Sequence, residues 1–132
     1  MRLSDVQALK RLPISDFLYQ RTKEELLAAA QRMGMPLSKK SPKSALVRKL
    51  DNLYTYYPHK LLPSLGAREK ACLAALFAAD CEGEASGETR ELERLGLVIA
   101  AGGGDEPEMA VCPYQLRELY QQKITDEEKN NE

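Results

Sequence analysis

Proline and glycine divide this chain into short segments, and this punctuation restricts the fold more than any other feature of the sequence. Pro13 closes one expected helix, and Pro42 and Pro113 each stand where another opens. Gly34 and Gly96 follow segments with helical periodicity, where a residue that adopts a left-handed backbone ends a helix. The chain is therefore expected to build mostly short helices.

Two apolar runs differ from this helical pattern. LVIAA (97–101) contains β-branched residues, and MAVC (109–112) follows it after a Gly-rich loop. They predict a hairpin, so the expected fold class is mainly α with a small β-hairpin (α+β). The longest purely apolar runs, such as LAALFAA (73–79), are far below the roughly 18 residues of a membrane-spanning helix. Because no secretory signal is evident either, we expect an intracellular protein, cytoplasmic or nucleoid/nuclear.

The formal net charge of −1 hides two halves of opposite charge. Residues 1–62 contain 12 Lys and Arg against 5 Asp and Glu, a balance of +7. Residues 63–132 contain 7 against 15, a balance of −8. A basic half suggests a polyanionic partner for that half alone. A dipolar monomer whose halves attract each other is the alternative.

Two short helices are expected at the start of the chain. Leu3, Val6 and Leu9 recur at intervals of three, which fits an amphipathic helix. Phe17 and Leu18 are expected to be buried in a second helix of one or two turns.

The next two helices have clearer boundaries. Thr22 and Glu25 have the spacing of a capping box, in which each side chain bonds the other residue's backbone N–H. The helix that they open ends at Gly34, and residues 35–37 must run extended because Pro36 disfavours helical geometry before it. A second helix is expected to open with Ser41 as its cap and proline at its first position.

The segment TKEELLAAAQRMGMPLSKKSPKSALVRKL (22–50) resembles the SAP-like family, especially the variant at the N-terminus of the Rho transcription terminator. The Thr cap, paired leucines, helix-ending glycine, extended MPLS, basic loop and closing LVRKL match in order, over about 30 of 132 residues. Seven residues separate Ser38 from Leu46, which favours the Rho-like variant. The resemblance implies a helix–extended loop–helix unit over about residues 20–54 that binds duplex DNA.

This segment also carries the strongest chemical signal. From Leu26 to Leu50 there are six cations and no acidic residue, and each cation can neutralise a phosphate. Backbone amides at the start of the second helix and two serine hydroxyls add neutral donors. The candidate nucleic-acid-binding residues are Arg32, Lys39, Lys40, Ser41, Lys43, Ser44, Arg48 and Lys49. The alternative is a solvated basic face that only keeps the helices soluble.

The acidic half resembles a winged-helix domain over roughly 64–122. Its expected order is a helix over 66–79, a polar break, a short helix capped by Ser86, the hairpin, and a last helix from Pro113; ELERLGLV (91–98) is its most family-like stretch. About 16 residues separate the first helix from the strand, so residues 80–95 hold one helix or two. The short helix and the hairpin tip carry carboxylates where DNA reading needs cations, so protein contacts are expected here instead.

Nothing in the sequence predicts catalysis, a metal or a cofactor. Cys72, Cys81, Cys112 and the single histidine, His59, lack the spacing of zinc ligands or of a nucleophile–base pair. The paired carboxylates and the Gly-rich loop lie in polar segments without the neighbours that acid–base or phosphate sites need. We therefore expect no enzyme.

Three tyrosines have two interpretations. Tyr54, Tyr56 and Tyr57 lie near Lys49 and Lys60, which is typical of a platform on which unpaired bases stack. Such a cluster also closes a core or packs a linker.

Together these observations predict a non-enzymatic nucleic-acid-binding protein, with duplex DNA as the expected partner and an acidic domain that contacts protein. The expected domains are a basic SAP-like domain (1–57), a linker (58–65), a winged-helix-like domain (66–122) and a polar tail (123–132). The alternative is an interaction or structural module, such as a homo-oligomer joined through its charged halves, that does not bind nucleic acid.

Overall fold

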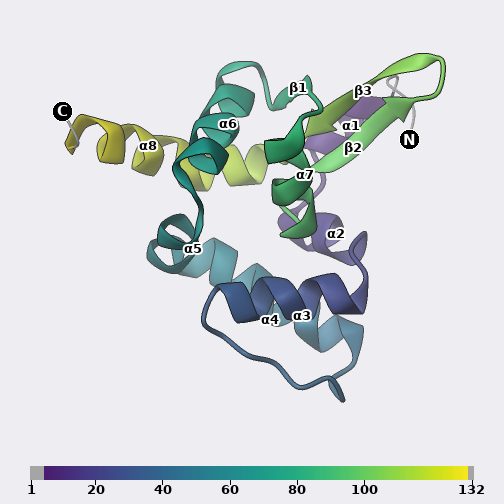
Figure 1. Ribbon diagram of the computed structural model, residues 1–132, viewed down its shortest axis with the longest axis vertical. Helices are drawn as coiled ribbons and strands as arrows, with labels where there is room; N and C mark the ends of the chain where they lie inside the picture. Colours follow the sequence, from purple (N-terminus) through teal and green to yellow (C-terminus); the bar gives the residue numbers. More distant parts are fainter. Residues whose placement is uncertain (1–4, 131–132) are drawn as a thin grey trace.

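The structure, a computed structural model, describes the backbone of residues 5–130 and the side chains of residues 5–127 (Figure 1). In chain order its elements are α1 (Val6–Lys10), α2 (Ile14–Tyr19), α3 (Lys23–Arg32), α4 (Lys43–Tyr56), α5 (Pro58–Ser64), α6 (Ala67–Ala78), β1 (Glu82–Glu84), α7 (Gly87–Arg94), β2 (Ile99–Gly103), β3 (Glu106–Val111) and α8 (Tyr114–Asn130). The protein is mainly helical with one small antiparallel sheet, so the predicted α+β class is confirmed.

The predicted ends of α3 are confirmed. Thr22 Oγ1 accepts a hydrogen bond from the Glu25 N–H at 3.1 Å, and Glu25 Oε1 accepts one from the Thr22 N–H at 3.1 Å. Gly34 has φ +77°, and the N–H of Met35 donates to the Ala30 carbonyl at 2.8 Å. These three bonds satisfy backbone groups at the two ends of α3, where a helix leaves such groups without an intrahelical partner.

The start of α4 differs from the prediction by one residue. Pro42, not Ser41, is the residue that flanks the helix, with ψ 154°. The Ser41 N–H donates to the Ser38 carbonyl at 3.1 Å, and this turn holds Ser41 outside the helix. Its side chain therefore makes no capping bond to α4.

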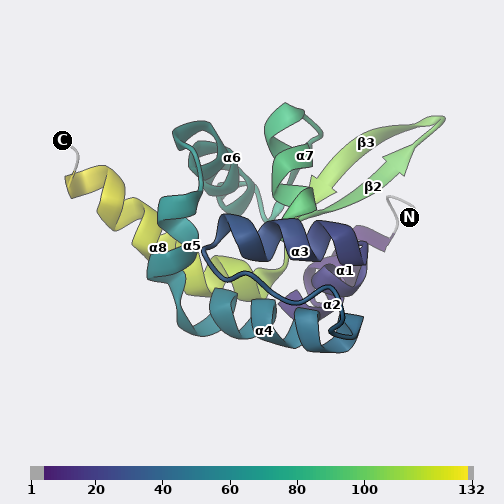
Figure 2. The same ribbon diagram turned by 60° about the horizontal axis from the view of Figure 1, so that its bottom comes forward.

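The sheet has three strands in the order β1-β3-β2. The hairpin of β2 and β3 was predicted, and it projects from the body of the molecule (Figures 1 and 2). The third strand, β1, was not predicted, because it lies in the segment expected to be a polar break. It pairs with β3, with Glu82 opposite Val111 and Glu84 opposite Met109. Residues 80–95 contain one helix, α7, which settles the question of one helix or two.

One hydrophobic core joins both halves of the chain. It includes Leu18 and Leu46 from the basic half and Leu92 and Tyr120 from the acidic half, all four fully buried. Tyr54, also fully buried, links α4 to the end of α7, because its hydroxyl donates to the Leu95 carbonyl at 2.7 Å. The Tyr120 hydroxyl donates in turn to the Tyr54 carbonyl.

A second core cluster lies between the first two helices and the sheet. Val6, Leu9 and Phe17 pack against Ile99, Ala101 and Val111. The predicted burial of Phe17 and Leu18 is thus confirmed, whereas Leu3, expected on the same face as Val6, lies outside the described residues.

Two segments expected to be irregular are helical. Most of the expected linker, 58–65, forms α5, whose Leu61 and Leu62 are buried in the larger core. Residues 123–130 of the expected tail continue α8, and Ile124 packs in the same core. The helix α5 and the part of α8 around Ile124 are therefore packed into the folded body.

Candidate nucleic-acid interface

The loop between α3 and α4 presents two lysines to solvent. The two helices lie side by side and run in the same general direction, so the loop must return along them (Figures 1 and 2). Within the loop, the Lys40 N–H donates to Ser38 Oγ at 3.1 Å, which closes a tight turn. Lys39 and Lys40 lie on this turn with exposed side chains.

Four of the eight predicted residues are exposed cations that form no ion pair among the described residues. They are Lys39, Lys40, Arg48 and Lys49. Exposed Ser44 lies one helical turn before Arg48, so both face outward from α4. These groups are available to an anionic ligand.

The N-terminus of α4 offers neutral donors beside these cations. Its first turn contains no acidic residue, and no side chain caps it. The N–H groups of Lys43 and Ser44 have no hydrogen-bond partner among the described residues. Such amides, aligned with the positive end of the helix dipole, favour a phosphate.

Two of the predicted residues are instead held by internal contacts. Arg32 donates from Nε and Nη2 to the Ser64 carbonyl, at 3.1 and 2.9 Å, and also pairs with Glu69. Burial alone would raise the pKa of Glu69, but the hydrogen bonds from Arg32 and from the Gly66 N–H, together with the charge of Arg32, outweigh it and lower that pKa. Lys43 Nζ donates to the Tyr19 carbonyl at 2.7 Å. Arg32 thus joins α3 to α5 and α6, and Lys43 joins α4 to α2.

Lys39 and residues of α3 together line a groove beside the loop. It has a volume of about 570 Å³ and is lined by Lys23, Leu27, Ala28, Gln31 and Lys39, with Glu24 as the one carboxylate of the lining. The α3 side of this groove has one cation, Lys23, balanced by Glu24, so Lys39 supplies its net positive charge.

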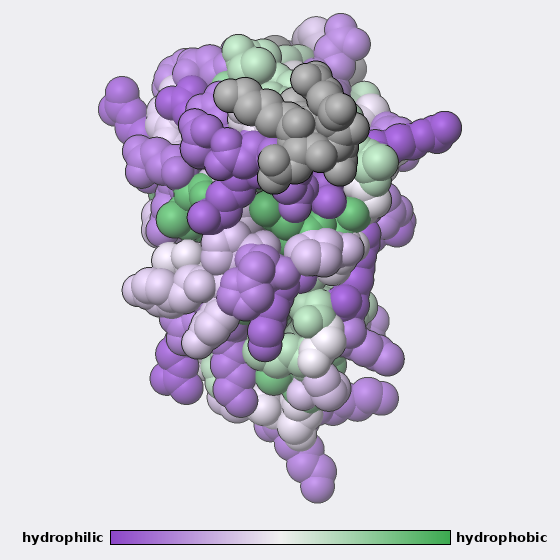
Figure 3. Space-filling model, turned by 90° about the vertical axis from the view of Figure 1, so that its left-hand side faces the viewer, coloured by the Kyte–Doolittle hydropathy of each residue, from purple (hydrophilic) through white to green (hydrophobic). Residues whose placement is uncertain are grey.

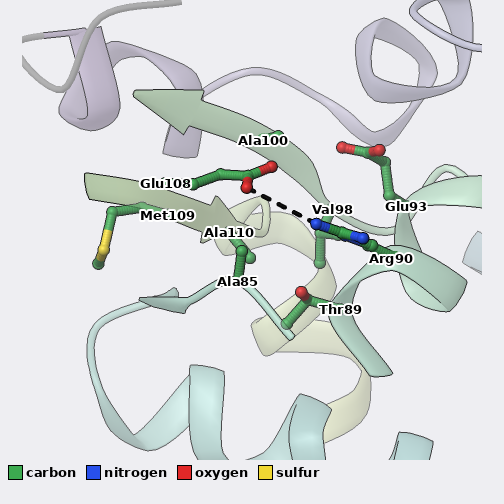
Figure 4. Close-up of a pocket in the computed structure, with 9 residues that line it drawn as sticks. All are labelled: Ala85, Thr89, Arg90, Glu93, Val98, Ala100, Glu108, Met109 and Ala110. Atoms are coloured by element: carbon green, nitrogen blue, oxygen red, sulfur yellow. Dashed lines mark ion pairs between the residues drawn. The ribbon is translucent and has the colours of Figure 1, made fainter. Parts of the chain in front are cut away.

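The groove between α7 and the sheet is smaller and is lined by paired opposite charges (Figure 4). Its volume is about 140 Å³, and the side chains of Arg90 and Glu108 point toward each other across it, with Nη2 and Oε2 3.9 Å apart. Glu93 also lines this groove. Arg94 pairs with Glu91 at 2.8 Å, so carboxylates neutralise both cations of α7.

The sequence did not identify one buried ionic cluster. Lys10 is fully buried, and its Nζ lies 3.1 Å from Asp80 Oδ2 and 3.1 Å from Glu82 Oε2. Burial alone lowers the pKa of Lys10, but the hydrogen bonds to Asp80 and Glu82, together with the charge of Glu82, outweigh it and raise that pKa. The signal was present in the helical spacing, because Lys10 stands four residues after Val6 on the apolar face of α1. The cluster attaches α1 to the end of α6 and to β1.

Comparison of the chain with protein-family models, curated proteins and solved structures finds no match. Within the described residues, no three His, Cys, Asp or Glu side chains are grouped as metal ligands would be. No helix in the described part of the chain combines the length and the apolar character needed to cross a membrane.

Proposed function

We propose that this protein is a non-enzymatic, intracellular nucleic-acid-binding protein that holds duplex DNA through its basic α3–loop–α4 unit. The observation that carries the proposal is the set of exposed, unpaired cations at Lys39, Lys40, Arg48 and Lys49, next to the free amides at the start of α4. Cations of this kind bind phosphates largely without regard to sequence and release counterions as they do so.

The helix–extended loop–helix order of this unit supports assignment to the SAP-like class. The capping box at Thr22, the left-handed Gly34 and the return loop are the features on which the resemblance depends. Arg32 and Lys43 contribute mainly by holding the unit to the rest of the protein, because their polar atoms already contact Ser64, Glu69 and Tyr19.

The acidic half is proposed to be a winged-helix-like domain that contacts protein. The order α6–β1–α7–β2–β3 and the sheet order β1-β3-β2 support this, with α7 in the position of a reading helix. The carboxylates on α7 and at the hairpin tip would repel phosphates, so this face suits a basic protein surface better than DNA.

Replacing two lysines tests the proposal. Lys39→Glu/Lys40→Glu is expected to weaken duplex binding at least about tenfold at low salt and to flatten the salt dependence, because two phosphate contacts become repulsive. Fluorescence anisotropy with a labelled duplex over a salt series measures both quantities. A matched control, Arg11→Glu/Arg68→Glu, makes the same change in net charge at two exposed cations, one directly after α1 and one on α6.

Comparing the two variants distinguishes the effect of a local interface on binding from the effect of net charge. Equal losses in both would show that only overall charge matters, which contradicts an interface on α3–loop–α4. Absence of any duplex binding by the wild-type chain at about 50 mM salt would sink the proposal, since counterion release favours binding most there. A mass that rises with concentration and falls with salt would then favour a homo-oligomeric interaction module.

A further inference from the structure

The tyrosines at the end of α4 divide into one buried residue and two exposed ones. Tyr54 is fully buried, whereas Tyr56 is 71% exposed and Tyr57 is 48% exposed. Since exposed tyrosines do not close a core, the core interpretation holds for Tyr54 alone. The Tyr57 ring contacts His59 at 5.9 Å between centroids and Lys60 Nζ at 5.6 Å. Tyr56 has no ring contact of either kind among the described residues.

Tyr56 forms part of the wall of a groove between α4–α5 and α8. The groove has a volume of about 570 Å³ and is lined by Tyr56, Pro58, His59, Leu62, Pro63, Lys123, Asp126 and Glu127. This volume falls within the range of about 300–1,000 Å³ typical of small-molecule sites. On the face that carries the end of α8, hydrophobic and intermediate surface gathers between strongly hydrophilic areas (Figure 3).

The groove lies at the end of the outward face of α4. Arg48, Asn52 and Tyr56 are exposed and follow one another at intervals of four residues, so they form one stripe along the helix. Lys49 lies two turns before Tyr56, a distance of roughly 10 Å along the axis. A strand whose phosphates contact Arg48 and Lys49 therefore leads toward the Tyr56 ring.

The charges in the groove favour a neutral, flat ligand group. On its α8 side Lys123 lies with Asp126 and Glu127, and Glu127 also pairs with Lys70 at 3.3 Å, so this side has no net positive charge. It therefore does not attract phosphates, which leaves a nucleic-acid backbone with the unpaired cations Arg48 and Lys49 on α4. A base carries no charge and has a π face, and a tyrosine ring binds such a face by stacking.

We propose that Tyr56 and the groove beside it bind an unpaired nucleobase, from a single strand that continues beyond the duplex held by α3–loop–α4. This inference rests on the proposed function and adds a ligand class to it: a duplex with a single-stranded overhang. Tyr57, supported by His59 and Lys60, forms the edge of the same site.

The test compares three labelled probes: a duplex, the same duplex with an oligothymidylate overhang, and the oligothymidylate alone. Tyr56→Ala is expected to weaken binding of the overhang probe at least about fivefold, the lower end of measured base–aromatic stacking, and to leave duplex affinity unchanged. Tyr56→Phe should restore the affinity. Tyr19→Ala, which removes a 45% exposed ring near the other end of α4, is the matched control and should change nothing.

Two further readouts identify stacking directly. A 2-aminopurine in the overhang should be quenched by the wild-type chain and by Tyr56→Phe, and not by Tyr56→Ala. The slope of log Kd against log salt concentration should be the same for the wild type, Tyr56→Phe and Tyr56→Ala, because neither substitution removes a phosphate contact.

The results distinguish this inference from the proposed function. If Tyr56→Ala binds the overhang as the wild type does, while Lys39→Glu/Lys40→Glu still loses the duplex, the base site is wrong and the DNA interface stands. An equal loss of duplex and overhang in Tyr56→Ala would also overturn it. If the wild type binds none of the three probes, both proposals fail.

Discussion

Replacing Gly96 with alanine is expected to lower the free energy of unfolding by about 2–5 kcal/mol. Gly96 ends α7 with φ +80°, a conformation that costs a residue with a Cβ about 1–2 kcal/mol. A Cβ at this position would also lie 2.4 Å from Leu18 Cδ2, inside the core that joins the two halves. Because Leu18 is fully buried, it has little room to move away. Urea denaturation followed by circular dichroism measures the loss.

Gly34 provides the matched control for the Gly96 substitution. It ends α3 with φ +77°, and a Cβ there would meet nothing within 4 Å. Gly34→Ala should therefore cost only the backbone term, about 1–2 kcal/mol. Adding Leu18→Ala to Gly96→Ala should produce less than the sum of the two separate losses, since the smaller side chain removes the clash. Equal losses at Gly34 and Gly96 would contradict the close contact with Leu18.

Neutralising the two partners of Lys10 is the second change expected to have a large effect. In Asp80→Asn/Glu82→Gln the ammonium of Lys10 stays buried without a compensating charge, and a fall in Tm of about 10 °C at neutral pH is expected. Lys10→Met should be much milder, because it removes the buried charge and leaves carboxylates that are 57% and 39% exposed. Thermal unfolding of the two variants beside the wild type makes the comparison.

The pH dependence of stability should have opposite signs in the wild type and in Asp80→Asn/Glu82→Gln. In the wild type the pKa of Lys10 is raised, so its contribution is complete below the unfolded value of about 10.4 and is lost as pH rises beyond it. In Asp80→Asn/Glu82→Gln the two carboxylates that raise the pKa of Lys10 are lost, so desolvation, the largest single cause, lowers it. That variant should therefore recover stability as the pH rises toward the unfolded value of about 10.4, because the buried amine loses its proton first in the folded state. A deficit that stays constant over this range would show that Lys10 is not the cause.

Local signals in the sequence predicted the helix ends well. The capping residues Thr22 and Ser86 and the glycines at 34 and 96 act within a few residues of themselves, so a single segment contains all the information. The hairpin was predicted for the same reason. β1 was missed because an edge strand of three residues, two of them Glu, has no apolar alternation to mark it.

The roles of single charged residues depended on distant partners. Arg32 looks like Lys39 in the sequence, yet its contacts lie on Ser64 and Glu69, more than 30 residues further along the chain. Lys10 and Asp80 are separated by 70 residues. A count of cations in a segment therefore predicted a basic surface, but only the contacts of the folded chain, from Arg32 to α5 and α6 and from Lys43 to α2, distinguish the cations that remain free.

The hydrogen bonds of Tyr54 and Tyr120 bear on how the molecule would report a ligand. They connect α4, α7 and α8 through one core, so these elements are expected to open to solvent together rather than in turn. A ligand on α4 that binds only the folded state would then slow hydrogen exchange at core amides of α8, which it does not touch. Such protection measures the free energy of binding and does not show which residues the ligand contacts. Mapping an interface on this chain therefore calls for chemical cross-linking instead.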